Sequence, residues 1–246
     1  MTMTKNSSPA AESNARGARN VVLVHGAWAD GSSWAKVIPL LQQRGLNAVA
    51  VQNPLTSLAD DVATTKRAIA RQEGVCLLVG HSYGGAVITE AGNDPKVVGL
   101  VYVAAFAPDE GEAVGDLGKD LPPPAGLAEL RPDEQGFLTL TAKGIQEYFA
   151  PDLAPLERNV MTATQGPTNA TVLGAKITRA AWRNKPTSYV VAGNDQMIPP
   201  DLERRFAKAM KAQTITVPSS HVPMLSHAAE VARLIIEAAQ SARERA

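Results

Sequence analysis

One pentapeptide in the sequence has residue types that could perform nucleophilic chemistry. Gly80-His81-Ser82-Tyr83-Gly84 follows the pattern G-x-S-x-G, and a short apolar run that ends at Val79 precedes it. A helical stretch begins just beyond Gly85, so the serine is expected on a sharp turn between a strand and a helix. Glycine suits such a turn because it has no side chain to clash with the neighbouring backbone. We therefore predict that Ser82 is a nucleophile.

A serine hydroxyl needs an adjacent base to act as a nucleophile at neutral pH, and the chain has four histidines. His25 and His81 lie in turns after strands; we expect His25 to brace its turn and His81 to face away from Ser82. His227 is expected to open a solvent-facing helix. His221 lies in a loop between the last strand and the last helix, where α/β folds place active residues, so we predict His221 as the base.

An acid should orient this imidazole and stabilise its protonated form. Asp195 follows the strand that ends near Ala192, again at a carboxyl strand end, and is the predicted acid. Asp109 follows the preceding strand and is the competing candidate.

The negative oxygen of a tetrahedral intermediate also needs hydrogen-bond donors. The backbone N–H of Tyr83 follows the nucleophile at the start of a helix and is the first predicted donor. The loop after the first strand, which contains Gly26, should supply the second donor, and the N–H of Ala27 is the best candidate. Trp28 is a candidate wall of the substrate pocket, although it could equally be a packing residue.

The elements around these residues alternate between short apolar runs and helical patterns, which predicts a mostly parallel α/β sheet with helices on both faces. The expected strands are 21–24, 46–51, 75–79, 97–103, 188–192 and 214–217, and the expected helices are 32–43, 57–73, 86–91, 201–211 and 228–242.

The alternation is interrupted between about residues 107 and 185. This stretch is rich in proline and glycine and shows only short helical pieces at 141–150 and 153–163. Long ordered insertions are usually functional, so we expect a lid over a pocket; a surface excursion without function is the alternative. Several large side chains could line the pocket or belong to the core: Phe106, Phe137, Tyr148, Phe149, Met161 and Trp182.

Composition excludes several other classes of protein. The 24 basic and 24 acidic residues balance, which argues against nucleic acid as the main partner. The single cysteine excludes disulfides within the chain and any cysteine-based zinc site. Apolar runs reach about ten residues, whereas a membrane span needs roughly 20. We expect a cytoplasmic protein with a disordered leader at 1–19 and one domain at 20–246, without metal or cofactor; a homodimer is left open.

Together these residues resemble the α/β-hydrolase superfamily, and within it the branch of plant methylesterases, hydroxynitrile lyases and small bacterial esterases. The resemblance spans residues 21–242, and the segments that carry it are Val24-His25-Gly26-Ala27, Gly80 to Gly85, Asp195 with Ile198-Pro199, and Ser220 to Ser226. The order Ser82, Asp195, His221 is that of the superfamily triad. The resemblance implies these three as the triad, Ala27 and Tyr83 as oxyanion donors, and a lid inserted after the sixth core strand.

Two positions discriminate within this branch. The resemblance implies that a hydroxynitrile lyase would carry threonine in place of Gly26 and lysine directly after the catalytic histidine, where this chain has Val222. Val222 cannot stabilise a departing cyanide, so hydrolysis of a small carboxylic ester is expected instead. Gly26, Trp28, Phe106 and Val222 are the candidate pocket residues. A ligand-binding receptor on the same fold, and an acyltransferase or perhydrolase, are the alternatives.

Overall fold

The computed structural model describes residues 17–242, and its centre is a six-stranded parallel sheet. The strand order is β2-β1-β3-β4-β8-β9, and every neighbouring pair runs parallel. The strands are β1 (Asn20–Val24), β2 (Asn47–Ala50), β3 (Cys76–Ser82), β4 (Val97–Ala105), β8 (Thr187–Ala192) and β9 (Gln213–Val217). All six lie where the apolar runs predict them, and no strand end differs from its predicted position by more than three residues. The predicted α/β class with a mostly parallel sheet is confirmed.

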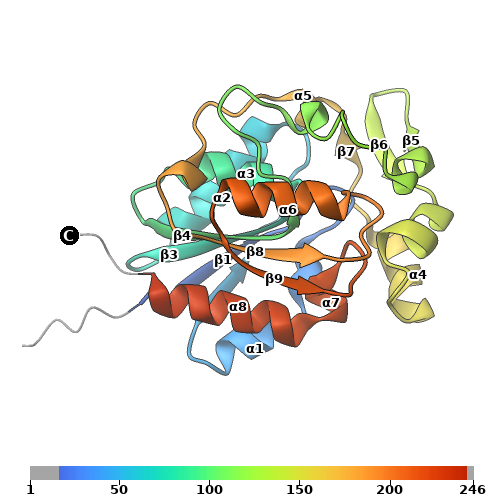
Figure 1. Cartoon of the computed structure of the whole chain (residues 1–246). Coiled ribbons are helices and arrows are strands. Elements are labelled where there is room, and N and C mark those ends of the chain that lie inside the picture. Colours follow the sequence, from blue (N-terminus) through green and yellow to red (C-terminus); the bar gives the residue numbers. More distant parts are fainter. Residues whose placement is uncertain (1–16, 243–246) are drawn as a thin grey trace, which may run out of the picture.

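Helices cover both faces of this sheet (Figure 1). On one face lie α2 (Leu58–Ala70), α3 (Gly84–Ala91) and α6 (Pro200–Ala209), and on the other α1 (Ile38–Gln42) and α8 (Ala228–Ser241), with the short α7 (Pro223–Ser226) before α8. Central strands read as unbroken apolar runs because both of their faces are buried; all five residues of β1 are buried, as are all seven of β3.

The helix predicted at 32–43 is wrong. The structure has a 3₁₀ turn at Gly31–Trp34 and then the five-residue α1. Pro39 lies in the first turn of α1 and has no N–H to donate, so a continuous helix through this residue is disfavoured. The prediction of a helix at 57–73 is closer to the structure, where α2 runs from Leu58 to Ala70. As predicted, Ser57 caps α2, because it accepts a hydrogen bond from the Asp60 N–H at 3.1 Å.

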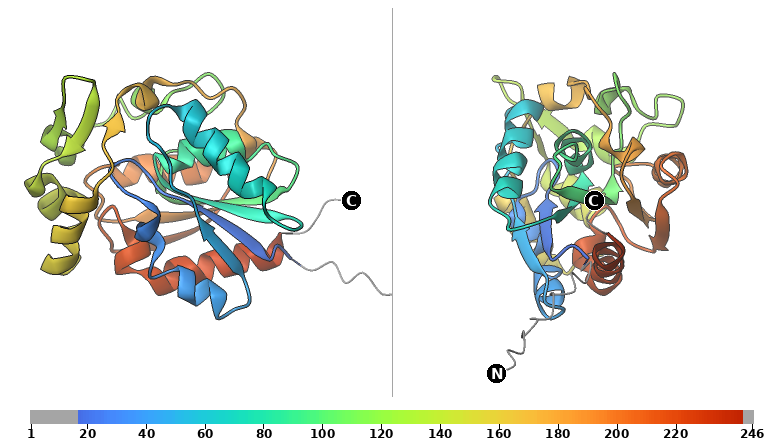
Figure 2. Two further views of the ribbon diagram at one scale, coloured as in Figure 1. Left: turned by 180° about the vertical axis from the view of Figure 1, so that it is seen from behind. Right: turned by 90° about the vertical axis from the view of Figure 1, so that its left-hand side faces the viewer.

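Between β4 and β8 the chain leaves the sheet for residues 106–186, called here the inserted segment. In both Figure 1 and the left view of Figure 2, its α4 (Pro155–Thr164), β5 and β6 lie beyond one end of the central sheet. It contains a three-stranded antiparallel sheet of β5 (Leu130–Pro132), β6 (Phe137–Leu140) and β7 (Thr168–Asn169), which the sequence did not predict. It also contains a π-helix at Gly144–Phe149, 3₁₀ turns at Val114–Asp116, Ala125–Glu129 and Ala181–Arg183, and α5 (Thr171–Gly174).

The inserted segment follows the fourth strand of the sheet along the described chain, not the sixth, because residues 17–105 contribute only four strands. At the N-terminus, residues 1–16 of the predicted leader lie outside the described residues. Ala18 is buried in the core, so the last part of the predicted leader packs against the domain.

In the described part of the chain, no helix combines the length and the apolar character needed to cross a bilayer. Cys76 is a free, buried thiol in β3, and burial raises its pKa to about 12.

Candidate active site

Ser82 is the last residue of β3 and lies where the strand turns into α3. Its φ angle is 53°, in the left-handed region that residues with side chains rarely adopt. The turn is tight, because a Cβ on Gly84 would lie 2.6 Å from the Val24 carbonyl oxygen and a Cβ on Gly85 would lie 2.1 Å from that of Phe106. Glycine is therefore required at both positions, and the backbone holds the Ser82 hydroxyl clear of the sheet.

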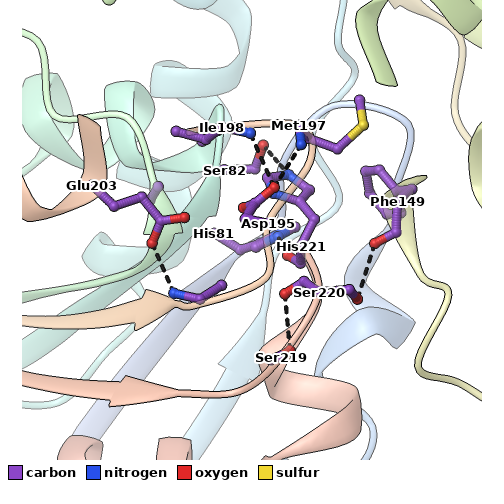
Figure 3. A network of polar contacts seen from close by, with 12 residues as sticks. His81, Ser82, Phe149, Asp195, Met197, Ile198, Glu203, Ser219, Ser220 and His221 are labelled. Carbon is purple, nitrogen blue, oxygen red and sulfur yellow. Dashed lines mark hydrogen bonds and ion pairs between the residues drawn. The ribbon is translucent and has the colours of Figure 1, made fainter. Parts of the chain in front are cut away.

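The structure brings Ser82, His221 and Asp195 together in one chain of hydrogen bonds (Figure 3). His221 Nε2 lies 2.8 Å from Ser82 Oγ, and His221 Nδ1 lies 2.6 Å from Asp195 Oδ2. An ionised carboxylate only accepts hydrogen bonds, so Nδ1 carries the proton and Nε2 is free to accept the serine proton. This is the arrangement that a general base for Ser82 requires.

Asp195 is itself held by backbone groups. Its Oδ1 accepts hydrogen bonds from the N–H groups of Met197 at 2.6 Å and Ile198 at 3.0 Å. The competing acid, Asp109, lies elsewhere: it forms an ion pair with Arg183, and the hydrogen bonds from that guanidinium hold the pKa of Asp109 below its usual value. Asp195 is therefore the carboxylate that meets His221.

The other three histidines take structural positions. His25 Nδ1 lies 2.8 Å from the Gly26 carbonyl oxygen, and His25 Nε2 accepts a hydrogen bond from the Asn53 N–H at 2.9 Å, so this ring braces the turn as predicted. His227 is the N-cap residue of α8.

His81 does point away from Ser82, but it has a role that the sequence did not reveal. Its Nε2 donates a hydrogen bond to the His221 carbonyl oxygen at 2.7 Å, and the two rings are 4.8 Å apart. Burial, followed by the neighbouring His221, holds the pKa of His81 well below its ordinary value. His81 is therefore a neutral donor that anchors the loop of His221.

The two predicted oxyanion donors lie beside the nucleophile. Tyr83 is the N-cap of α3, and the first N–H groups of a helix have no partner within the helix. Its side chain is fixed, because the hydroxyl donates to Asp61 Oδ2 at 2.8 Å. The loop before Ala27 passes close to the nucleophile, since a Cβ on Gly26 would lie 2.6 Å from Ser82 Cβ. Tyr83 therefore directly follows Ser82, and Ala27 follows a glycine that packs against Ser82; their role as oxyanion donors stays a prediction.

The inserted segment contacts the loop of His221 directly, which sequence reasoning missed. Asp152 accepts hydrogen bonds from the Ser220 N–H at 2.9 Å and from the Ser220 hydroxyl. Loss of solvent raises the pKa of Asp152, but these hydrogen bonds outweigh that effect and hold it below its ordinary value. The Phe149 ring is fully buried, with its centroid 5.0 Å from that of His221.

A cavity of about 170 Å³ opens onto Ser82 and His221. Trp28 and Phe106 line it, as predicted. Gly26 and Val222 are not among the lining residues: Gly26 packs against the Ser82 side chain and the His81 carbonyl oxygen, and Val222 is fully buried in the core. The remaining lining residues are apolar or lack a polar side chain, and they come from the inserted segment, the loop after Asp195 and the first turn of α6: Val114, Gly115, Leu117, Gly118, Pro124, Leu127, Leu130, Leu173, Met197, Ile198, Pro199 and Leu202.

Comparison with known proteins agrees with this geometry. A profile of the alpha/beta hydrolase family matches residues 21–234. The chain belongs to this family.

Among curated relatives of this alpha/beta hydrolase is a pyrethroid hydrolase of Sphingobium wenxiniae (strain DSM 21828 / CGMCC 1.7748 / JZ-1). It is 25% identical over 262 residues, which cover 92% of this chain and 89% of the relative. A carbendazim hydrolyzing esterase of Nocardioides sp. (strain SG-4G) is 34% identical over 119 residues, covering 42% of this chain and 49% of the relative. The solved structure of polyneuridine aldehyde esterase has a TM-score of 0.75 at 17% identity and covers 89% of this chain and 98% of its own.

These relatives support the assignment of the chain as a carboxylic ester hydrolase. Within residues 17–242, no group of three or more histidine, cysteine, aspartate or glutamate side chains is arranged to hold a metal ion.

Proposed function

We propose that this alpha/beta hydrolase cleaves a small, uncharged carboxylic ester through a covalent acyl-enzyme intermediate on Ser82. The observation that carries the proposal is the hydrogen-bond chain from Ser82 through His221 to Asp195 at the edge of a cavity. A serine with such a partner can lose its proton as it attacks, which a free serine cannot do at neutral pH.

In the proposed reaction, Ser82 Oγ attacks the ester carbonyl carbon while His221 Nε2 takes its proton. The negative oxygen of the tetrahedral intermediate accepts hydrogen bonds from the backbone N–H groups of Ala27 and Tyr83. The intermediate collapses, the C–O bond to the alcohol breaks, and His221 returns the proton to the leaving alcohol. Water then attacks the acyl-enzyme by the same route and releases the acid and Ser82.

The walls of the cavity support a small, uncharged substrate. Apart from Ser82 and His221, no described lining residue carries an ionisable side chain. The cavity of about 170 Å³ is small beside the roughly 300–1,000 Å³ that is usual for drug-sized ligands. We therefore propose that esters of short acids are preferred, with the inserted segment acting as a lid that limits the access of bulk solvent to the cavity.

The test is hydrolysis of nitrophenyl esters from acetate to octanoate by the parent protein and by Ser82→Ala. We expect turnover that is fastest for the short acids, and a loss of about five orders of magnitude in kcat for Ser82→Ala. Ser241→Ala, which changes an exposed serine at the end of α8, is the matched control and should behave like the parent. Parental turnover by Ser82→Ala would contradict the proposal.

A further inference from the structure

Glu203 is a buried acidic residue next to the candidate active site that the proposed mechanism does not use. It lies on α6, and its exposed fraction is 0%. Its Oε2 accepts a hydrogen bond from the Ala192 N–H at 2.9 Å, at the end of β8 and three residues before Asp195. Figure 3 shows the Glu203 carboxyl group on the side of Asp195 away from Phe149.

The second oxygen of Glu203 is the unusual feature. Oε1 is buried and has no hydrogen-bond partner among the described residues, although the oxygen of an ionised carboxylate would need a donor. A charged oxygen that is buried and unpaired is strongly unfavourable, so such a group is expected to be protonated and to donate a hydrogen bond to a neighbouring acceptor.

The groups that face Glu203 favour its neutral form. The Asp195 side chain lies within hydrogen-bonding reach, and Tyr189 on β8 is close enough for the two groups to interact. The cation that acts on Glu203 is Arg204 on the same helix, and it pairs with the exposed Asp201 at 2.7 Å. Burial, followed by the neighbouring carboxylate of Asp195, raises the pKa of Glu203 well above its usual value, against the weaker effect of the Ala192 N–H.

We propose that Glu203 is a protonated positioning residue whose Oε1–H donates a hydrogen bond to the Asp195 carboxylate. This assignment gives Oε1 a partner and extends the chain Ser82, His221, Asp195 by a fourth member. Asp195 has room for it, because a carboxylate offers about four acceptor sites, and His221, Met197 and Ile198 occupy three.

The proposal rests on the proposed function and adds a consequence for catalysis. A donor on Asp195 stabilises its negative charge and makes it a weaker base, so the proton stays on His221 Nδ1 when His221 becomes an imidazolium. Glu203 touches neither substrate nor the reacting atoms; it acts through Asp195.

The test compares Glu203→Gln with Glu203→Leu. The glutamine amide can still donate to Asp195 and its carbonyl oxygen can still accept from the Ala192 N–H, so kcat should stay within about threefold of the parent and the acid limb of the pH profile should not move. Leucine removes the donor. We expect kcat to fall tenfold or more with KM little changed, and the acid limb to move to higher pH by roughly half a unit to one unit, because His221 then faces a more basic carboxylate.

A second readout needs no activity. The pKa of Glu203 is raised in the folded state, so the folded protein keeps this proton above pH 4.5, where the unfolded chain releases it. The free energy of unfolding of the parent therefore falls as pH rises from 4.5 toward the folded pKa. Glutamine carries no such proton. The difference in Tm between Glu203→Gln and the parent should therefore grow in favour of the variant from pH 5 to pH 8. Glu230→Gln, at an exposed position on α8, should show no such growth.

Three results would overturn the proposal. An acid limb that moves to lower pH in Glu203→Gln would show that Glu203 is ionised in the parent. Parental kcat and pH profile in Glu203→Leu would show that it does not act on Asp195. A Tm difference that does not change with pH would show that it is not protonated. If the parent has no serine-dependent turnover, the proposed function fails, while the Tm comparison still decides the protonation of Glu203.

Discussion

At the scale of single residues, the site depends on which nitrogen of His221 carries the proton. Asp195 fixes this with two separate oxygens: Oδ2 meets His221, while Oδ1 accepts from the N–H groups of Met197 and Ile198. The carboxylate cannot rotate without losing both backbone donors. Its orientation, and through it the tautomer of His221, is set by the loop that follows β8.

The different partners of the two Asp195 oxygens predict the effect of Asp195→Asn. The amide oxygen should occupy the position of Oδ1, because only an acceptor can satisfy Met197 and Ile198. The NH₂ group must then face His221 Nδ1, which forces the proton onto Nε2, where it can no longer accept from Ser82. We expect kcat for nitrophenyl butyrate to fall by about four orders of magnitude while the fold is retained. The measurement is steady-state kinetics with Tm as a fold check.

Asp201→Asn is the control for Asp195→Asn, since Asp201 is exposed on α6. It should keep parental kcat. A kcat above a tenth of the parental value in Asp195→Asn would contradict the assigned role of Asp195 in orienting His221.

The residues of the predicted triad could be found from the sequence because each lies at or shortly after the carboxyl end of a strand of a parallel sheet, and such strand ends converge at one edge. Glu203 and Phe149 could not be found in the same way. Glu203 lies in a helix whose neighbours Asp201, Arg204 and Arg205 are exposed, so its own burial is visible only once α6 packs on the sheet. The contact of Phe149 with His221 joins positions 72 residues apart, and no local pattern encodes it.

At the scale of elements, the loop of His221 is held from two sides. His81, at the end of β3, donates to the carbonyl oxygen of His221, and Asp152 of the inserted segment accepts from Ser220. The inserted segment therefore does more than line the cavity, because it also makes hydrogen bonds to the loop that carries His221.

We predict that Asp152→Ala loosens this loop. The variant should lose about 1 kcal/mol of stability at neutral pH, or about 2–4 °C in Tm, and kcat should fall severalfold because His221 is less well placed. The pKa of Asp152 is lowered in the fold, so its contribution is present above the unfolded pKa and is lost as pH falls through the folded pKa. The Tm difference between variant and parent should thus shrink toward pH 3.

Thermal unfolding at several pH values, together with kcat, tests Asp152→Ala. Glu134→Ala, at an exposed position of the same segment, is the control and should leave both unchanged. A Tm difference that is the same at pH 7 and pH 3 would show that the charge of Asp152 is not what holds Ser220.

The elements that sequence reasoning missed share a physical cause. β5, β6 and β7 have three, four and two residues, too few for a period of two to stand out from a stretch rich in proline and glycine. Their pairing also joins Phe137 to Asn169, far apart in the chain. The longer strands of the central sheet are predictable because each is a buried apolar run between turn residues.

At the scale of the whole molecule, the cavity lies between the central sheet, which the sequence predicts well, and the inserted segment, which it does not. The cavity is lined by Ser82 at the end of β3 and by His221 in the loop after β9, and also by Leu117, Leu127 and Leu130 of the inserted segment. In the proposed function, the strand ends of the sheet position the reacting groups, and the inserted segment limits the size of the substrate. The proposed chemistry could therefore be predicted from the sequence, while the size of the cavity required the structure.

The size of the cavity predicts the effect of Phe106→Ala. Phe106 directly follows β4, and its ring lines the cavity close to Phe206, with the ring centroids 6.5 Å apart. Removing the ring should extend the cavity toward α6 and admit longer acyl chains. One methylene in an apolar pocket changes discrimination by about 1–3 kcal/mol, so kcat/KM for the hexanoate ester should rise at least about tenfold relative to the acetate ester.

Phe137→Ala provides the matched control, because Phe137 lies on β6 and is not part of the cavity wall. It should leave the preference for short chains unchanged, whatever its effect on stability. The ratio of kcat/KM for two substrates is measured on the same enzyme, so partial unfolding of either variant cancels from it. An unchanged ratio in Phe106→Ala would mean that the acyl chain does not reach Phe106 in this cavity.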